Sequence, residues 1–324
     1  MSLVTRAYNS FDINKKRGTI IKKSKDEKLH DEISYYKSIR TNNNLYVYFP
    51  RYISDNYLDK TYYLELEYYA YDNLGDHMIS DTFDENLWYD AYTILKKALI
   101  EFSAISTYNN YKNIAKSMYV DKTEKYFKDL TENFNEFNKI CLYDKLTINS
   151  IKYMNFQYIW EDIKKIIEND LYKLDKLQII HGDFCFSNIL CGINKKTDTR
   201  LLKFVDPRGS FGKLGICGDP LYDYAKLYHS FNGCYEYIIY DKFNLKMNDD
   251  LFKFDYEYTN DNYKKIEEIF SQDKVFTDYR VKLISGLIFI GMCSRHYDSF
   301  QRQIIMYCTG VRMLNEVLEN YVKR

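Results

Sequence analysis

The segment between positions 181 and 209 constrains this chain more than any other. Two short apolar runs within it, Asn188–Ile193 and Leu201–Val205, predict β-strands separated by a polar turn. Strands joined in this way form a hairpin, which brings Asn188 beside Asp206 although eighteen residues separate them. An amide and a carboxylate held side by side are suitable ligands for one hard cation. The segment therefore predicts a metal site at the end of a small sheet.

The residues that lead into this hairpin add the groups that phosphate transfer needs. An apolar strand is predicted over Lys176–His181, and Asp183 ends it. The order His-x-Asp-x-x-x-x-Asn has the spacing of a kinase catalytic loop, with glycine in place of arginine. In that chemistry Asp183 accepts the proton of the attacking hydroxyl, and Asn188 and Asp206 hold Mg²⁺ against phosphate oxygens. His181 is expected to brace the loop, because a buried, hydrogen-bonded histidine is commoner than a catalytic base.

Backbone geometry is constrained over a wider region around this segment. Seven of the twelve glycines and two of the three prolines lie between positions 182 and 233, and loops held rigidly in this way often carry function. The glycines of Gly209–Gly218 predict either a mobile loop that lines a substrate cleft or an irregular surface turn. Arg208, just before them, is expected either to contact phosphate or to pair with an acidic neighbour.

A helix is predicted to begin at Pro220. Proline suits the first turn of a helix, and Asp219 suits the capping position before it. Asp223 lies one turn inside this helix, where its carboxylate faces either solvent or the preceding loop.

The amino-terminal seventy residues predict the order strand, strand, helix, strand, strand, which is the plan of a kinase amino lobe. A polar turn over Asn9–Arg17 is expected between the first two strands, and Ser24 is placed to cap the helix. The predicted strands are Leu3–Tyr8, Gly18–Lys23, Leu45–Phe49 and Thr61–Tyr69, and the predicted helix is Asp26–Arg40.

This plan assigns a lysine and a glutamate to nucleotide binding. A lysine on the strand before the helix holds the phosphates, and a glutamate on the helix orients it. Lys22 and Glu32 are the candidates, because Gly18, Ile20 and Lys22 share one strand face. Lys23 is the rival if the strand register slips by one residue. The alternative is a lysine-rich surface strand beside a solvated glutamate.

No glycine-rich loop is present to hold phosphates. Gly18 is the only glycine before Gly75, so the pattern G-x-G-x-x-G is absent from this part of the sequence. A bound nucleotide would then be contacted by the turn around Asn9, Ser10 and Phe11, through backbone amides and the Ser10 hydroxyl.

Together, these patterns predict an α+β fold in two lobes for the whole chain. The amino lobe is expected over residues 1–70 and the carboxy lobe over 71–324. Glu67–Ala70 is expected to form the hinge, where backbone groups pair with the nucleotide base. The carboxy lobe is predicted to be mainly helical, with helices over 85–108, 114–139, 156–174, 262–271, 276–293 and 304–321.

Composition excludes several classes of function. The formal net charge is zero, with 46 basic and 46 acidic residues, which argues against nucleic acid as the main partner. Seven cysteines without a C-x-x-C pair predict reduced thiols. Met1–Tyr8 lacks a signal-peptide core, and the most apolar run, Leu283–Cys293, is about half the length of a membrane helix. We therefore expect a soluble, cytoplasmic protein.

Three motifs together carry a specific resemblance. The chain resembles the aminoglycoside phosphotransferase and choline kinase superfamily, and in motif style it is closest to bacterial members linked to surface-sugar or capsule synthesis. The motifs are His181-Gly182-Asp183 with Asn188, then Asp206-Pro207, then Gly218-Asp219-Pro220 with Tyr222-Asp223.

This resemblance implies a two-lobed protein-kinase-like fold that uses ATP, or GTP, with Mg²⁺. The γ-phosphate is then expected to move to a hydroxyl of a small molecule, either a sugar or an amino alcohol such as choline. Asp183 corresponds to the catalytic base, Asn188 and Asp206 to the metal ligands, Lys22 to the phosphate-binding lysine, and Asp219 to the acid that supports the catalytic loop.

Three alternatives stay open at this point. An aminoglycoside acceptor is disfavoured, because no cluster of acids for a polycation is evident in the sequence. A protein kinase is disfavoured by the missing glycine-rich loop, by His-Gly-Asp in place of His-Arg-Asp, and by the lack of an Ala-Pro-Glu segment. A nucleotide-binding module without catalysis is disfavoured, because Asp183, Asn188 and Asp206 are all present.

Overall fold

The computed structural model describes residues 9–103, 106–107, 111–173, 177–194, 199–212, 215–258 and 262–322. The chain divides into two compact units. The first comprises Met1–Thr107 with Leu177–Asp223, and the second comprises Tyr108–Lys176 with Tyr224–Arg324. The amino-terminal sheet and the hairpin segment therefore lie in the same unit. The predicted boundary between lobes at residue 70 stays a prediction.

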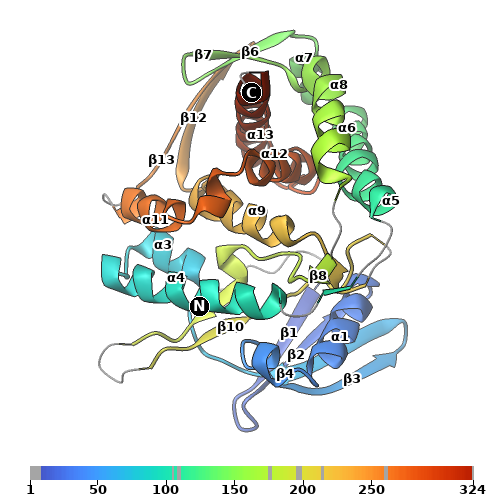
Figure 1. Ribbon diagram of the computed structural model, residues 1–324, viewed down its shortest axis with the longest axis vertical. Coiled ribbons are helices and arrows are strands. Elements are labelled where there is room, and N and C mark those ends of the chain that lie inside the picture. The colour runs from blue at the N-terminus through green and yellow to red at the C-terminus, as the bar shows by residue number, and fades with distance from the viewer. Residues whose placement is uncertain are drawn as a thin grey trace. The chain divides into compact units, whose positions relative to one another are not determined.

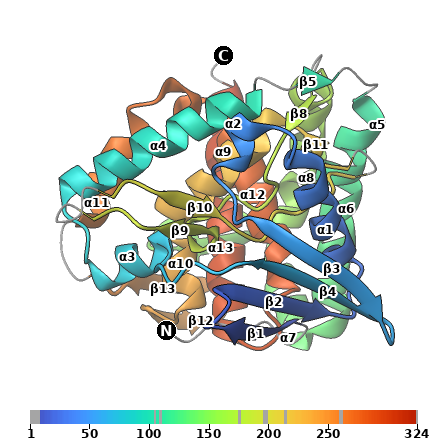
Figure 2. The same cartoon turned by 90° about the horizontal axis from the view of Figure 1, so that it is seen from below.

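An antiparallel sheet of four strands forms the amino-terminal part of the first unit (Figure 1). Its order is β1-β2-β4-β3, and Figure 2 shows the four strands side by side. The strands are β1 (Asn9–Asn14), β2 (Thr19–Ser24), β3 (Tyr52–Leu58) and β4 (Thr61–Glu67). The predicted strands at Gly18–Lys23 and Thr61–Tyr69 are thus confirmed, with bounds shifted by one or two residues.

Helix α1 (Lys28–Ile39) confirms the predicted helix between β2 and the next strand. Its residues Leu29, Ile33 and Ile39 recur at helical spacing and are buried, as an amphipathic helix requires. The predicted cap was wrong. Ser24 Oγ accepts a hydrogen bond from the backbone of Asp26 (3.1 Å), which lies ahead of the helix.

Three further expectations for this region need correction. The predicted strand Leu3–Tyr8 lies outside the described residues, and most of the predicted turn Asn9–Arg17 is strand β1. Leu45–Phe49 is not a strand, because helix α2 (Asn43–Tyr46) occupies its start, with Asn42 accepting from the Leu45 backbone (3.3 Å). Strand β3 was missed because most of it is exposed, so it lacks the alternation of apolar residues that marks a strand.

The predicted hairpin is present as β9 (Ile189–Cys191) and β10 (Leu202–Phe204), which pair antiparallel with Phe204 opposite Ile189. The predicted entering strand is β8 (Leu177–Ile179), which lies between β5 (Ser106–Thr107) and β11 (Cys217–Gly218). Helices α3 (Leu74–Ser80) and α4 (Glu85–Ser103) complete the first unit. The predicted helix 85–108 is therefore confirmed up to Ser103.

The core of the first unit is aromatic. The Phe49 ring is fully buried and lies 5.4 Å from the Tyr35 ring and 6.1 Å from the His181 ring. It also meets Phe204 at 5.7 Å, edge to face. Rings packed in this way bury a large apolar area and fix side-chain positions. The core therefore joins α1 to the loop that begins at His181.

The second unit is helical with a small sheet. The sheet has the order β12-β13-β6-β7, with β13 parallel to β6, and its strands were not predicted. They are β6 (Lys145–Ile148), β7 (Ile151–Met154), β12 (Phe243–Asn248) and β13 (Leu251–Tyr256). The helices are α5 (Lys112–Ala115), α6 (Lys122–Asn133), α7 (Asn135–Cys141), α8 (Phe156–Ile166), α10 (Tyr235–Ile239), α11 (Asn262–Ser271), α12 (Tyr279–Cys293) and α13 (Phe300–Val322).

Helix α9 (Pro220–Phe231) begins in the first unit and continues into the second. The predicted helix over 114–139 is divided by a π-helical turn at Lys116–Asp121 and by the extended Phe134 between α6 and α7. The predicted helix over 156–174 is α8, which ends in a π-helical turn at Ile167–Leu171. Among the described residues, no helix is both long and apolar enough to cross a bilayer. All seven cysteines are free thiols, as their sequence spacing predicted.

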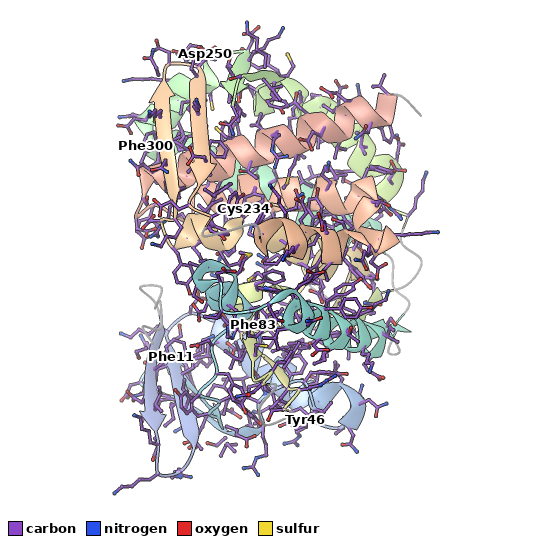
Figure 3. The ribbon with its side chains drawn as sticks, turned by 90° about the vertical axis from the view of Figure 1, so that its left-hand side faces the viewer. Phe11, Tyr46, Phe83, Cys234, Asp250 and Phe300 are labelled. Atoms are coloured by element: carbon purple, nitrogen blue, oxygen red, sulfur yellow. The ribbon has the colours of Figure 1, made fainter. Side chains whose placement is uncertain are left out.

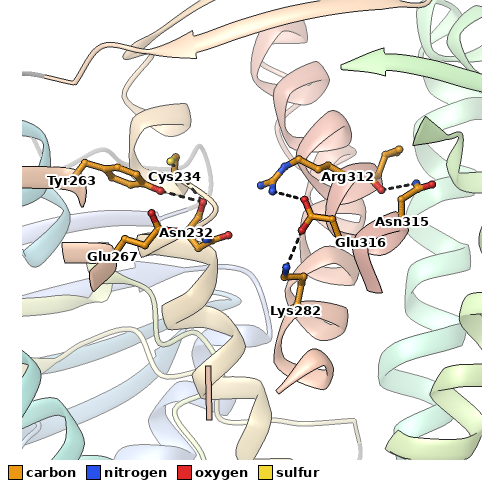
Figure 4. Close-up of polar contacts among 9 residues, drawn as sticks. Asn232, Cys234, Tyr263, Glu267, Lys282, Arg312, Asn315 and Glu316 are labelled. Carbon is orange, nitrogen blue, oxygen red and sulfur yellow. Dashed lines mark hydrogen bonds and ion pairs between the residues drawn. The ribbon is translucent and has the colours of Figure 1, made fainter. Parts of the chain in front are cut away.

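Polar contacts join the long helices of the second unit (Figure 4). Glu316 on α13 accepts from Lys282 Nζ on α12 (2.9 Å) and from Arg312 Nη1 one turn before it (2.9 Å). Asn315 exchanges two hydrogen bonds with the backbone of Met154 on β7, at 3.0 and 2.9 Å. These contacts hold the small sheet and α12 to α13.

Candidate active site

Lys22 lies on the buried face of the amino-terminal sheet. In the strand register it stands opposite Leu64 of β4, which is fully buried, and opposite Phe11 of β1. Figure 3 labels Phe11 on the amino-terminal sheet. Lys22 Nζ donates to Glu32 Oε2 of α1 at 2.6 Å and also pairs with Asp206 Oδ1. Lys22 and Glu32 are buried, whereas the Asp206 side chain is half-exposed. Three predicted site residues therefore meet at one ammonium group.

The rival Lys23 points to the other side of the sheet, because successive residues of a strand face opposite ways. Its Nζ pairs with Asp12 and lies 5.8 Å from the Tyr63 ring centre. Ser10 stands opposite Lys23 in the register and is exposed. The structure therefore brings Lys22, and not Lys23, to Glu32, and it does not bring Ser10 to this cluster.

Burial and charge act against each other in the cluster. Burial lowers the pKa of Lys22, but the carboxylates of Asp206 and Glu32 outweigh it, so that the pKa rises and the ammonium stays charged. Burial raises the pKa of Glu32 to about 7, against the attraction of Lys22 and in the same sense as the repulsion of Asp206. The buried ammonium is thus held between two acids of different exposure.

The loop that carries Asp183 is held by a buried acid on α9. Asp223 Oδ2 accepts from the backbone nitrogen of His181 (2.7 Å), and Oδ1 accepts from that of Gly182 (2.8 Å). Asp219 Oδ1 accepts from the backbone of Leu221 (2.9 Å), which confirms it as the helix cap. The acid that reaches the loop from this helix is Asp223, whose orientation the sequence pattern left open.

Hydrogen bonds also define both ends of the Asp183 peptide unit. Its backbone nitrogen donates to His181 Nδ1 (3.3 Å), and its carbonyl accepts from Asn188 Nδ2 (2.8 Å). His181 is fully buried, in agreement with its expected bracing role. Because Nδ2 of Asn188 faces the Asp183 carbonyl, the amide oxygen is the atom of Asn188 that could hold a cation.

The hairpin places Asn188 and Asp206 next to each other. The backbone nitrogen of Val205 donates to the carbonyl of Asn188 (3.0 Å), one residue before Asp206. Asp206 has φ +61°, a left-handed conformation that aspartate adopts more readily than most residues. The backbones of these two residues therefore approach each other, as the predicted hairpin requires.

Arg208 explains the glycine of the His-Gly-Asp motif. Its backbone nitrogen donates to the carbonyl of His181 (2.8 Å). A Cβ atom at Gly182, which has φ +77°, would lie 2.8 Å from Arg208 Cβ. Arg208 Nη1 donates to the Tyr222 hydroxyl (2.9 Å). The space that a side chain at position 182 would need is occupied by Arg208.

Gly209 brings the same loop into contact with α1. It has φ +67°, and a Cβ atom there would overlap the backbone carbonyl of Asp31 and lie 2.9 Å from the backbone nitrogen of Glu32. Further on, the backbone nitrogen of Phe211 donates to the Gly215 carbonyl (2.9 Å). The loop after Asp206 therefore touches the helix that carries Glu32.

Gly209→Ala should lower the melting temperature and displace α1, because the new methyl group meets backbone atoms that cannot rotate away. Gly215→Ala is the matched control, since Gly215 has φ +66° and no atom within 4 Å of its Cβ position. We expect Gly215→Ala to lower the free energy of unfolding by about 1–2 kcal/mol, because alanine is strained in the left-handed conformation. Gly209→Ala should lower it by more. Equal losses in chemical denaturation would contradict the close contact with α1.

The described residues contain no group of three or more His, Cys, Asp or Glu side chains that could hold a metal ion. Asn188 and Asp206 fit a different arrangement, because Mg²⁺ is commonly bound through one or two protein ligands and completed by substrate phosphates. One neutral amide oxygen and one carboxylate suit that coordination.

No family model matches this chain, and no curated protein sequence matches it. Solved structures match over nearly its whole length. The GDP complex of wild-type aminoglycoside 2′-phosphotransferase-IIIa has a TM-score of 0.55 and 14% identity, covering 99% of this chain and 92% of that chain. The apo form of a thermostable mutant of aminoglycoside phosphotransferase APH(4)-Ia has a TM-score of 0.59 and 9% identity, covering 98% and 94%.

A ternary complex of APH(4)-Ia with AMP-PNP and hygromycin B has a TM-score of 0.53 and 11% identity, covering 97% of this chain and 92% of that chain. These likenesses confirm the predicted α+β, two-lobed kinase-like fold, with an antiparallel sheet at the amino terminus and a mostly helical carboxy-terminal part. At such identities the likeness concerns the fold.

Proposed function

We propose that this chain is a phosphotransferase that moves the γ-phosphate of ATP, or of GTP, to a hydroxyl group of a small molecule. The observation that carries this proposal is the contact of Lys22 with both Glu32 and Asp206. A buried ammonium beside a half-exposed carboxylate is the pairing that binds nucleotide phosphates together with their metal ion in kinase-type sites.

Each neighbouring group has a role in this reaction. Asp183 would accept the proton of the acceptor hydroxyl, on a loop whose backbone Asp223 and Asn188 hold in place. Lys22 would neutralise phosphate oxygens, and Glu32 would keep its ammonium aimed at them. Asn188 and Asp206 would hold Mg²⁺, which neutralises charge on the phosphate oxygens when it is bound.

The acceptor that we favour is a sugar or an amino alcohol such as choline. An aminoglycoside is the second candidate, because hygromycin B is part of the ternary complex of the similar APH(4)-Ia. Both nucleotides stay in the proposal, since the similar structures contain GDP in one case and AMP-PNP in another. A cytoplasmic location is consistent with a nucleotide substrate and seven free thiols.

An acceptor screen tests the proposal directly. Sugars, choline, ethanolamine and aminoglycosides are incubated with the protein and ATP or GTP, and phosphorylated products are detected by mass spectrometry. We expect one acceptor class to be phosphorylated with Mg²⁺ and none when the cation is chelated. Failure to phosphorylate any acceptor with either nucleotide would count against the proposed activity.

A pair of lysine variants tests the site. Lys22→Met should lower kcat/KM by about 10²-fold or more, because it removes a preorganised cation from the phosphates. Lys23→Met should stay within about threefold of the unchanged protein, because the Lys23 side chain is 33% exposed and pairs with Asp12. An equal decrease of kcat/KM in the two variants would contradict the assignment of Lys22 as the phosphate-binding lysine.

A further inference from the structure

Helix α1 contains two adjacent tyrosines, Tyr35 and Tyr36, that are fully buried. Neither hydroxyl has a hydrogen-bond partner among the described residues. The Phe49 ring packs against both, at 5.4 Å from the Tyr35 ring and 6.1 Å, edge to face, from the Tyr36 ring. Because a buried hydroxyl without a partner is costly, fully buried hydroxyls of this kind call for a physical explanation.

The two hydroxyls have different surroundings. Tyr36 follows Glu32 by four residues, so both side chains lie on the same face of α1. Burial raises the pKa of Tyr36 well above its usual value, and the nearby Glu32 and Asp206 raise it further, in that order. The hydroxyl therefore remains protonated and can act as a donor beside these two acids.

Tyr35 lies beside other groups. Burial raises the pKa of Tyr35 well above its usual value, and among its neighbours the charge of Asp223 raises it most. Both oxygens of Asp223 already accept backbone hydrogen bonds, at 2.7 Å and 2.8 Å. Asp223 thus has its partners in the loop, and nothing in the proposed reaction changes them.

The contacts of Glu32, unlike those of Asp223, change in the proposed reaction, because its partner Lys22 is shared with Asp206. In the proposed reaction, Asp206 turns to the metal ion and Lys22 to the phosphates. Glu32 must then hold the Lys22 ammonium in one orientation without the neighbouring carboxylate. A second donor on the same helix face, supplied by Tyr36, would fix the carboxylate of Glu32 at that stage.

We infer that Tyr36 is a positioning residue whose hydroxyl donates to the Glu32 carboxylate when nucleotide is bound, and so holds Lys22 on the phosphates. The inference rests on the proposed function. The Tyr36 hydroxyl, which has no hydrogen-bond partner among the described residues, gains one as the Lys22–Asp206 pair opens.

Tyr36→Phe tests this inference, because it removes the hydroxyl and keeps the ring. Tyr35→Phe is the matched control: it makes the same change at the next residue, with equal burial. The dissociation constants of AMP-PNP and a non-hydrolysable GTP analogue, each with Mg²⁺, are measured by calorimetry, and the melting temperature is measured with and without nucleotide. We expect Tyr36→Phe to weaken nucleotide binding about tenfold and to shrink the nucleotide-induced rise in melting temperature.

The nucleotide-free proteins are expected to behave differently. Without nucleotide, both variants should melt at or above the temperature of the unchanged protein, because each loses an unpartnered polar group. Tyr35→Phe should bind nucleotide within about twofold of the unchanged protein.

Three results would overturn the inference alone. They are undiminished nucleotide binding by Tyr36→Phe, equal weakening in both variants, and a lower melting temperature of nucleotide-free Tyr36→Phe. If the unchanged protein binds neither nucleotide, the proposed function fails first, and the inference falls with it. The binding constant of the unchanged protein therefore separates the two failures.

Discussion

Asp183→Asn is expected to reduce phosphotransfer by about 10²–10⁴-fold, because an amide cannot accept the proton of the acceptor hydroxyl. The loop itself should stay in place. The backbone nitrogen of Asp183 donates to His181 and its carbonyl accepts from Asn188, and the substitution leaves both of these bonds in place. The loss should therefore appear in kcat, with the nucleotide dissociation constant and the melting temperature close to those of the unchanged protein.

The control for this prediction is Asp59→Asn. Asp59 is exposed in the turn between β3 and β4 and has φ +50°, a conformation that asparagine tolerates well. The same chemical change away from the site should leave kcat unchanged. Retention of more than about a tenth of the activity by Asp183→Asn would contradict its role as the catalytic base.

Asp223→Ala is expected to lower the free energy of unfolding by about 2–5 kcal/mol, because it leaves two buried backbone N–H groups without an acceptor. These groups belong to His181 and Gly182, and Asp223 is only 1% exposed. Since both donors lie in the loop that positions Asp183, kcat should fall together with stability. Chemical denaturation followed by circular dichroism measures the first effect.

A partly exposed cap serves as the comparison for this prediction. Asp278 Oδ1 accepts from the backbone of Arg280 at the start of α12 (2.9 Å), with a side chain that is 23% exposed. Asp278→Ala should lower the free energy of unfolding by about 1 kcal/mol, as is typical when an N-cap side chain is removed. If Asp223→Ala unfolds at the same denaturant concentration as the unchanged protein, Asp223 does not hold the loop.

Local periodicity predicted the elements that carry the candidate site. Alternation along β2 placed Lys22 on one strand face, and helical spacing predicted the helix that carries Glu32; the structure then showed that both side chains are buried. The short apolar run at Leu45–Phe49 was misassigned, because periodicity alone does not distinguish a buried strand from a buried helix over five residues. The sheet of the second unit was missed, since its strands are short and lie among longer helical patterns.

Other features of the site depend on contacts between distant segments. The family resemblance implied that Asp219 supports the loop, whereas the residue pattern alone placed it as a helix cap; in the structure, Asp223 makes bonds to His181 and Gly182. Asp219 caps this helix and Asp223 lies in its first turn, and the packing of the helix brings the Asp223 carboxylate to the loop. The close approach of Gly209 to α1 has no local signal at all.

The sequence by itself determined the chemical groups and their local directions: Asp183, Asn188 and Asp206 at the ends of short strands, and Lys22 on one strand face. The tertiary structure alone decided that Lys22 meets Asp206 across 184 positions, that Asp223 holds the loop, and that the Tyr36 hydroxyl is buried without a hydrogen-bond partner among the described residues. The physical reason is that local sequence determines local geometry only. Backbone periodicity sets the face on which a side chain lies, whereas contacts between distant segments depend on how whole elements pack.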